Sequence, residues 1–349
     1  MSMGLDYVIF YIHSYLQAME TILNLHDIAL LLNYERASTE PRFRHTKLRE
    51  VADDATNFQT IRILTPDWDE ATVPKTGFVF DRAKKTIEKN QDDDSPDLPT
   101  TMLPTSVPLK LQNLTLKQLE TYYWQARNHD GCFRTVTLFQ HFIDLFPPDT
   151  QVRVPTVHKG SPMVYTTIAD HRRIMEFNLF EPASVSLSCV FPDNMTYISG
   201  SDKVIPHAVL GFGSSVTYVD TILDLASLQF GNVGRGYKGH GLFVLEPIDQ
   251  YITRLDKFAK RNTFNNCKMS VRIDDAPDNI WLLAVAKKTK DRWDKRATEP
   301  WCGYCGAPPQ KDQSLKRCAA CKNAHYCNAD HQRSAWSFHK HFCAKPKTK

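Results

Sequence analysis

The metal-binding chemistry of this 349-residue chain is concentrated near its end, where six of the nine cysteines lie between Cys302 and Cys343. Potential ligands form four pairs: Cys302 and Cys305, Cys318 and Cys321, Cys327 and His331, and His339 and Cys343. In the first two pairs two residues separate the thiols, so one tight turn directs both sulfurs at a single ion. In the last two pairs the ligands are four residues apart, on one face of a helical turn. Together the pairs predict two four-coordinate zinc sites.

The eight ligands can be divided between two ions in two ways. Division in chain order would leave the second ion with neither of the closely spaced cysteine pairs. Giving each ion one such pair and one helical pair is more economical, and it interlocks the sites. We therefore expect site one to contain Cys302, Cys305, Cys327 and His331, and site two to contain Cys318, Cys321, His339 and Cys343. Four protein ligands leave no coordination position for water at either ion, so we expect structural rather than catalytic zinc.

Residues 302–343 closely resemble the MYND-type zinc finger. Besides the ligand pairs, the residues that carry the resemblance are Tyr326, Gln332, Trp336 and Lys340. The resemblance implies the same cross-braced pairing of ligands. It also implies that the finger binds proteins, often through short proline-containing peptides.

His331 stands where this family usually has a cysteine. Imidazole also binds zinc well, so site one is expected to hold its ion with three thiolates and one histidine. His325 and His341 are then spare histidines that do not bind metal.

The charge of the chain is uneven. The formal net charge is +4 at pH 7, but residues 302–349 alone hold nine basic and two acidic residues. A basic surface could contact nucleic acid. The finger lacks, however, the two-cysteine, two-histidine arrangement with a single recognition helix that DNA-reading fingers use. We therefore favour a protein partner over nucleic acid, with the basic residues forming a solvated face.

The start of the chain bears on its cellular compartment. It is apolar, but it carries Asp6 and Glu20 and no basic leader, which favours a buried helix over a signal peptide. No apolar run approaches the ~18 residues that span a bilayer, so no membrane partner is expected. Clustered thiols without a secretory signal favour metal binding in a reducing compartment. We therefore expect an intracellular protein, in the nucleus or the cytoplasm.

A second group of residues could perform cysteine chemistry. Cys132 lies at the start of a predicted helix, where amide donors and the helix dipole favour a thiolate. His207 and Asp224 lie on neighbouring predicted strands. This chain order is that of papain-like and transglutaminase-like hydrolases, and residues 207–231 resemble their His…Asp-Leu-x-x-x-Gln-Phe region. The resemblance implies a triad of Cys132, His207 and Asp224. Asp220 is an alternative third member, because it is expected on the same face of the strand as Asp224.

The same three residues also have a purely structural interpretation. Cys132 would then be a small buried hydrophobic residue, His207 a hydrogen-bonded residue at the end of a strand, and Asp224 an acceptor in a turn. A close approach of Cys132 to His207 would distinguish the two interpretations.

The rest of the chain is predicted to form an α+β body. Helices are expected at 1–34, 114–127, 135–146 and 247–261, and strands at 151–157, 183–191, 207–212 and 215–225. The glycine-rich segment 231–241 matches neither the P-loop nor the dinucleotide-binding fingerprint. We interpret it as a flexible connection in which Arg235 is solvated.

The predicted organisation has five parts: a mostly helical region at 1–87, an acidic, proline-rich linker or loop at 88–108, an α+β domain at 109–296, the finger at 302–343 and a basic tail at 344–349. Residues 279–296 begin as a buried segment and end as a charged spacer, so we expect body and finger to have separate cores. The favoured function is protein–protein interaction through the finger. The alternative is a cysteine hydrolase or acyltransferase whose finger recruits partners.

Overall fold

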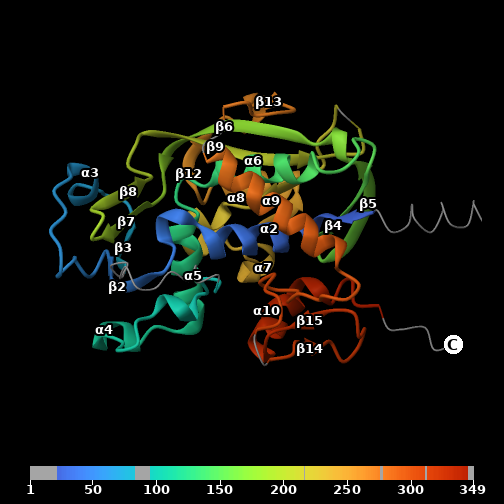
Figure 1. Cartoon of the computed structure of the whole chain (residues 1–349). Helices are drawn as coiled ribbons and strands as arrows, with labels where there is room; N and C mark the ends of the chain where they lie inside the picture. The colour runs from blue at the N-terminus through green and yellow to red at the C-terminus, as the bar shows by residue number, and fades with distance from the viewer. Residues whose placement is uncertain (1–21, 83–94, 216, 276–277, 311–312, 345–349) are drawn as a thin grey trace, which may run out of the picture.

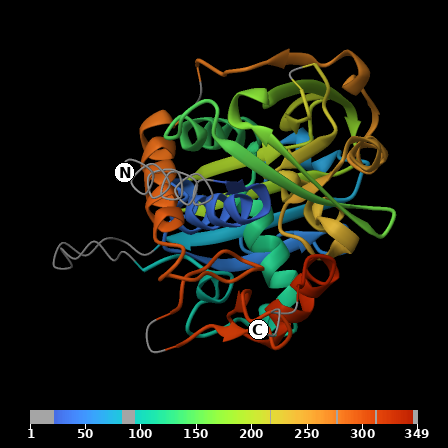
Figure 2. The same cartoon turned by 90° about the vertical axis from the view of Figure 1, so that its right-hand side faces the viewer.

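The computed structural model contains a mixed helix and sheet body with a small C-terminal finger beside it (Figure 1 and Figure 2). It describes residues 22–82, 95–215, 217–275, 278–310 and 313–344. The predicted fold class, an α+β body followed by a finger, is confirmed. Residues 1–21 of the helix predicted over 1–34 lie outside the described residues, Leu23–Asn24 form a short strand, and the helix itself starts at Leu25.

Three sheets form the framework of the body. The largest contains, in order, β11 (Val244–Pro247), β10 (Thr221–Asp224), β9 (Val204–Phe212), β6 (Arg173–Pro182) and β12 (Ala259–Asn262), with β13 (Lys268–Ser270) paired to β6. The second contains β2 (Thr46–Asp53), β3 (Lys75–Arg82), β7 (Val185–Phe191) and β8 (Met195–Ser199). The third contains β1 (Leu23–Asn24), β4 (Gln151–His158) and β5 (Ser161–Ile168).

Three long helices pack together on one side of the largest sheet (Figure 1): α2 (Leu25–Thr39), α6 (Cys132–Ile143) and α9 (Asn279–Asp294). The remaining body helices are α3 (Pro66–Asp69), α4 (Leu109–Gln112), α5 (Leu116–Arg127), α7 (Tyr237–His240) and α8 (Ile248–Leu255). A run of 3-10 turns, η4 (Ser227–Gly234), packs against α5. Within the described part of the chain, no helix is both long and apolar enough to cross a membrane.

Local sequence explains where two of the important helices begin. The side chain of Asn24 accepts hydrogen bonds from the first amides of α2, at His26 and Asp27. At α5, the Thr115 hydroxyl accepts from the Gln118 amide while the Gln118 side chain accepts from the Thr115 amide. Such caps satisfy donors that a helix leaves free in its first turn, so they fix both starting points.

The structure departs from the predicted elements where strands pair. The helix expected over 247–261 ends at Leu255, and β12 then pairs with β6. The region predicted to be mostly helical contains the helices α2 and α3, but also β2 and β3, which pair with each other over most of their length. In both cases pairing with a strand distant in sequence decides the conformation, which local patterns do not report.

Candidate metal centres

The finger is built from a two-stranded ribbon and one helix. The ribbon pairs β14 (Lys316–Arg317) with β15 (His325–Tyr326), and the helix is α10 (Ala329–His339). The Asn328 side chain caps α10 by accepting from the amide of His331 at 2.9 Å. This cap holds His331 in the first turn of the helix, while His339 is its last residue.

Site one draws its ligands from a turn and from the start of α10. Cys302, Cys305, Cys327 and His331 bring their ligand atoms within 4.8 Å of one another. The sulfurs of Cys305 and Cys327 are 3.8 Å apart, and Nδ1 of His331 lies 3.4 Å from the sulfur of Cys302. His331 therefore presents Nδ1 to the metal position.

Site two joins the second turn to the far end of α10. Cys318, Cys321, His339 and Cys343 form a cluster of the same dimensions. The sulfurs of Cys318 and Cys343 are 3.9 Å apart, and Nε2 of His339 lies 3.6 Å from the sulfur of Cys321. In this site the histidine presents Nε2, the opposite ring nitrogen to that of site one.

Both clusters fit tetrahedral zinc. Bonds of ~2.3 Å to sulfur and ~2.0 Å to nitrogen place sulfur atoms ~3.8 Å apart and sulfur and nitrogen ~3.6 Å apart around one ion. The four measured separations lie close to these values. The predicted two-zinc, cross-braced arrangement is confirmed, and neither cluster includes His325 or His341. Four protein ligands at each site leave zinc a structural role.

The finger shares a hydrophobic core with the body. Cys302, Cys318, Cys321 and Tyr326 belong to one cluster of buried residues with body side chains such as Trp124. The expectation of separate cores is therefore wrong. The physical reason is that the finger alone has too little apolar volume to cover its own buried face, and the body supplies the rest.

A buried polar network joins the finger to α5. The Tyr304 hydroxyl, between two ligands of site one, donates to the Glu120 carboxylate at 2.7 Å. Arg235 donates to the same carboxylate at 2.9 Å and to the Tyr304 oxygen at 3.2 Å. It also donates to the Thr121 hydroxyl at 2.8 Å. Arg235 is only 2% exposed, so its predicted position in solvent is wrong: its charge is paired inside the protein.

The segment expected to be a spacer also belongs to the body. The helix α9 runs through it, and Trp293 is buried in the core formed with α2 and α6. Arg292 donates to Glu35 of α2 at 2.6 Å and to the carbonyl oxygen of Gly306 at 2.7 Å. Gly306 has a φ of +76°, and a side chain there would collide with the Leu30 carbonyl. The finger backbone therefore lies directly on α2.

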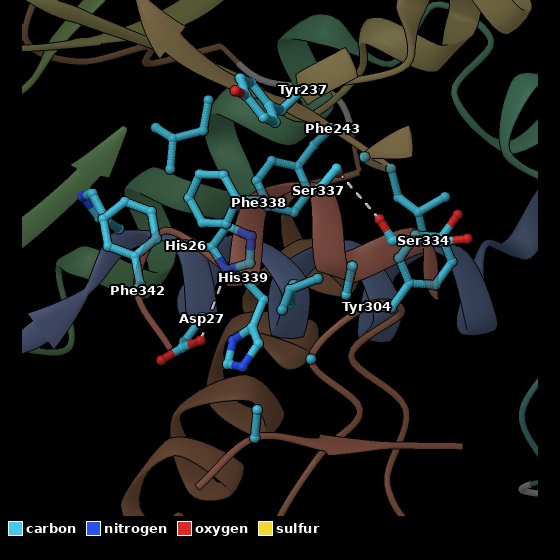
Figure 3. Close-up of a pocket in the computed structure, with 18 of the residues that line it drawn as sticks. His26, Asp27, Tyr237, Phe243, Tyr304, Ser334, Ser337, Phe338, His339 and Phe342 are labelled. Atoms are coloured by element: carbon cyan, nitrogen blue, oxygen red, sulfur yellow. Dashed lines mark hydrogen bonds and ion pairs between the residues drawn. The ribbon is translucent and has the colours of Figure 1, made fainter. Parts of the chain in front are cut away.

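Aromatic side chains also pack α10 against the body (Figure 3). The ring of Phe338 stacks on that of His26, with centroids 4.4 Å apart and planes 8° apart. Tyr237 approaches the same phenylalanine edge-on, and Phe243 packs against His26. A cavity of about 150 Å³ remains between the two parts, and the zinc ligand His339 lines it. One face of α10 is thus covered by the body.

The structure pairs two members of the second candidate group, His207 and Asp224, while the sulfur of Cys132 lies 3.9 Å from the carbonyl oxygen of Pro206. His207 on β9 lies 2.9 Å from Asp224 on β10, measured from Nε2 to a carboxylate oxygen. Burial opposes protonation of His207, but Asp224 and then Cys132 outweigh it and raise the pKa of His207 to about 10. The alternative residue Asp220 instead accepts a hydrogen bond from the Ser214 amide.

Two further side chains surround His207. The Tyr251 hydroxyl donates to Asp224 at 2.8 Å, and the Gln229 side-chain amide lies 3.1 Å from Nδ1 of His207. The thiol of Cys132 is only 4% exposed. The arrangement can therefore hold a thiol beside an oriented imidazole, but a substrate could reach the sulfur only after a conformational change. The assignment of a catalytic triad stays a prediction.

Sequence reasoning missed the residues that attach the finger. Tyr304 could have been noticed as a large aromatic side chain between two zinc ligands. Glu120 and Arg235 gave no signal, because they lie 184 and 69 residues from Tyr304, their partner in the finger. Arg292 lies only 14 residues from Gly306, but it was interpreted as part of a charged spacer.

Known proteins resemble this chain at the finger. The family model described as MYND finger matches residues 302–343. The MYND-type zinc finger protein samB of Aspergillus terreus is 27% identical over 78 residues, which cover 22% of this chain and 13% of that protein. The proteins of the same name from Aspergillus niger and Aspergillus fumigatus match to the same extent. The match thus spans about an eighth of the length of these relatives. No solved structure gives a significant match.

The first prediction concerns the metal content. The purified chain should contain two zinc ions, because eight ligands form two closed clusters. Elemental analysis of the fully loaded protein measures this directly. One ion per chain would contradict the two-site assignment. Cys302→Ser and Cys318→Ser should each remove a different ion, which tests the cross-braced pairing.

The second prediction concerns His331. His331→Cys should keep zinc in site one, since it restores a thiolate, whereas His331→Ala should weaken binding because three ligands remain. Competition with a chromophoric chelator measures both affinities. An unchanged affinity in His331→Ala would mean that another histidine is the ligand.

The third prediction concerns the polar network of Tyr304, Glu120 and Arg235 that connects the finger to α5. Glu120→Ala should destabilise the whole chain by about 3 kcal/mol, because it leaves the Arg235 charge buried without its carboxylate. Chemical denaturation of the zinc-loaded protein measures the change. The control is Asp291→Ala, which removes an exposed ion pair with Lys295 on α9 and should change stability little. Equal effects of the two substitutions would contradict the role given to the network.

Proposed function

Because residues 302–343 are a MYND finger, we propose that the protein binds a protein partner through the exposed face of this finger. The observation that supports this proposal is the division of α10 into two faces. Phe338 on one face packs against the body, while Trp336 on the other is 44% exposed. Large aromatic side chains commonly anchor protein interfaces, and a half-exposed tryptophan on a rigid helix is ready to do so.

The partner is a protein that presents a proline-containing segment. The flat indole of Trp336 can pack against a pyrrolidine ring, and such segments lose little conformational entropy on binding because they are already extended. Gln332, one helical turn before Trp336, offers a donor and an acceptor to the peptide backbone. The site works inside the cell, in the nucleus or the cytoplasm, where reducing conditions keep the zinc-binding thiolates intact.

The fourth prediction tests this face. Trp336→Ala should weaken the binding of proline-containing peptides by at least about tenfold while the zinc content stays at two ions. Titration calorimetry with such peptides, and with the same peptides carrying alanine for proline, measures the effect. Arg333→Ala is the matched control, because Arg333 is an exposed residue of the same helix whose charge is paired with Asp330. Equal binding by the tryptophan variant and the control would contradict the proposal.

The contacts of His207 favour a second candidate function, cysteine-dependent hydrolysis or acyl transfer in the body. Asp224 would orient the imidazole, which would take the proton of Cys132, and amides at the start of α6 would stabilise the thiolate. The finger would then recruit a partner to the enzyme. This function requires a movement that exposes the sulfur and releases Nδ1 of His207 from the Gln229 amide, because Nε2 already contacts Asp224.

The fifth prediction tests the cysteine. In the zinc-loaded protein Cys132 should react with iodoacetamide faster than Cys189 or Cys267, because His207 would take the proton of Cys132, whereas burial raises the pKa of the other two thiols. His207→Ala should slow the reaction of Cys132. Mass spectrometry of the alkylated peptides measures each rate. If Cys132 reacts no faster than Cys189, the body has a structural rather than a catalytic cysteine.

A further inference from the structure

A groove of about 550 Å³ lies on the body between α5 and η4. The ends of β3 and β7 complete its walls. Its lining residues include Lys117, Gln125, Ser184, Phe230, Gly231 and Lys257. None of the residues that line it belongs to the finger, so this groove differs from the face of Trp336.

Gln125 presents a carboxamide to the groove. The residue lies on α5, is 5% exposed and lines the groove, and its side chain makes no hydrogen bond to the described residues. A carboxamide offers two donors and two acceptor positions, which here stay available to a ligand. A polar side chain in this position is therefore suited to pair with a ligand.

The backbone beside this amide is kept free of side chains. Gly231 has a φ of +65° and a ψ of −143°, a conformation essentially restricted to glycine. A Cβ atom on Gly231 would lie 3.1 Å from the Gln125 oxygen. A larger residue would be strained and would crowd the amide, so glycine keeps the floor of the groove open.

The charged residues that line the groove are both lysines, so its charge is positive. Lys117 and Lys257 are exposed at its edge, and neither makes an ion pair within the described part of the chain. No acidic side chain is among the residues that line the groove. A bound ligand therefore meets two uncompensated positive charges.

We propose that this groove binds an extended acidic peptide. One peptide group, with its N–H and C=O, is the complement of the Gln125 carboxamide and can form two reciprocal hydrogen bonds with it. Acidic side chains on either side of that group then reach Lys117 and Lys257, while Phe230 supplies an apolar wall. The proposal depends neither on peptide binding by Trp336 nor on catalysis by Cys132.

The groove also lies next to the His207 cluster. The ring of Phe230 is 5.4 Å from that of His207, centroid to centroid, and it stacks on Phe258 with centroids 4.0 Å apart. Gln229, which precedes Phe230, contacts the His207 imidazole. A peptide that displaces Phe230 would therefore disturb the environment of His207.

The test uses the full-length, zinc-loaded protein and fluorescein-labelled hexapeptides that alternate alanine with aspartate, glutamine or lysine. Fluorescence anisotropy should show binding of the aspartate peptide in preference to the other two. The double variant Lys117→Glu, Lys257→Glu should weaken this binding at least about tenfold, and Gln125→Leu about tenfold. The double variant changes exposed residues and keeps the test valid if Gln125→Leu folds poorly.

Two controls separate this groove from other surfaces. Lys203→Glu, which changes an exposed lysine outside the groove, and Trp336→Ala should leave the affinity for the aspartate peptide unchanged. Equal binding of the three peptides, no binding, or wild-type affinity in the double variant would overturn the proposal. So would tighter binding of a labelled single-stranded RNA that requires the lysines but not Gln125.

Discussion

The placement of the finger on the body depends on the buried ion pair that the guanidinium group of Arg235 forms with Glu120. The guanidinium group lies inside the molecule, and Tyr304 of the finger donates to the same carboxylate on α5. A buried charge tolerates the loss of its partner poorly, so these three groups are stable only together. Because Tyr304 lies between two ligands of site one, the position of the zinc cluster and the position of α5 are fixed by one network.

Because the finger packs against the body, the zinc sites stabilise more than the finger itself. In an isolated finger, zinc replaces the hydrophobic core that so short a segment cannot form. Here the same ions also hold Cys302 and Tyr326 against the core of the body, and Gly306 against α2. The body covers one face of α10 and leaves Trp336 on the other, so the docking of the finger decides which surface a partner can reach.

The parts of the structure that sequence could predict are those with local causes. Spacings of two and three residues between ligands reflect one turn or one helical turn, so the zinc clusters could be predicted directly, as could α5 from the helical spacing of its apolar residues. The polar network between the finger and α5 could not be predicted. Arg235 lies in a glycine-rich segment that resembles a solvated loop, and its partners Tyr304 and Glu120 are more than sixty residues away. For the same reason β12, whose partner is β6, was expected to be helix.

Finger and body thus form one cooperative unit held by zinc and the Arg235 network. Hydrogen–deuterium exchange before and after removal of zinc with a chelator measures this cooperativity. Chelation should increase exchange in α5 and η4 of the body as well as in the finger, because Glu120 and Arg235 lose Tyr304 together with the zinc. Increased exchange confined to residues 302–343, with α5 and η4 unchanged, would contradict it.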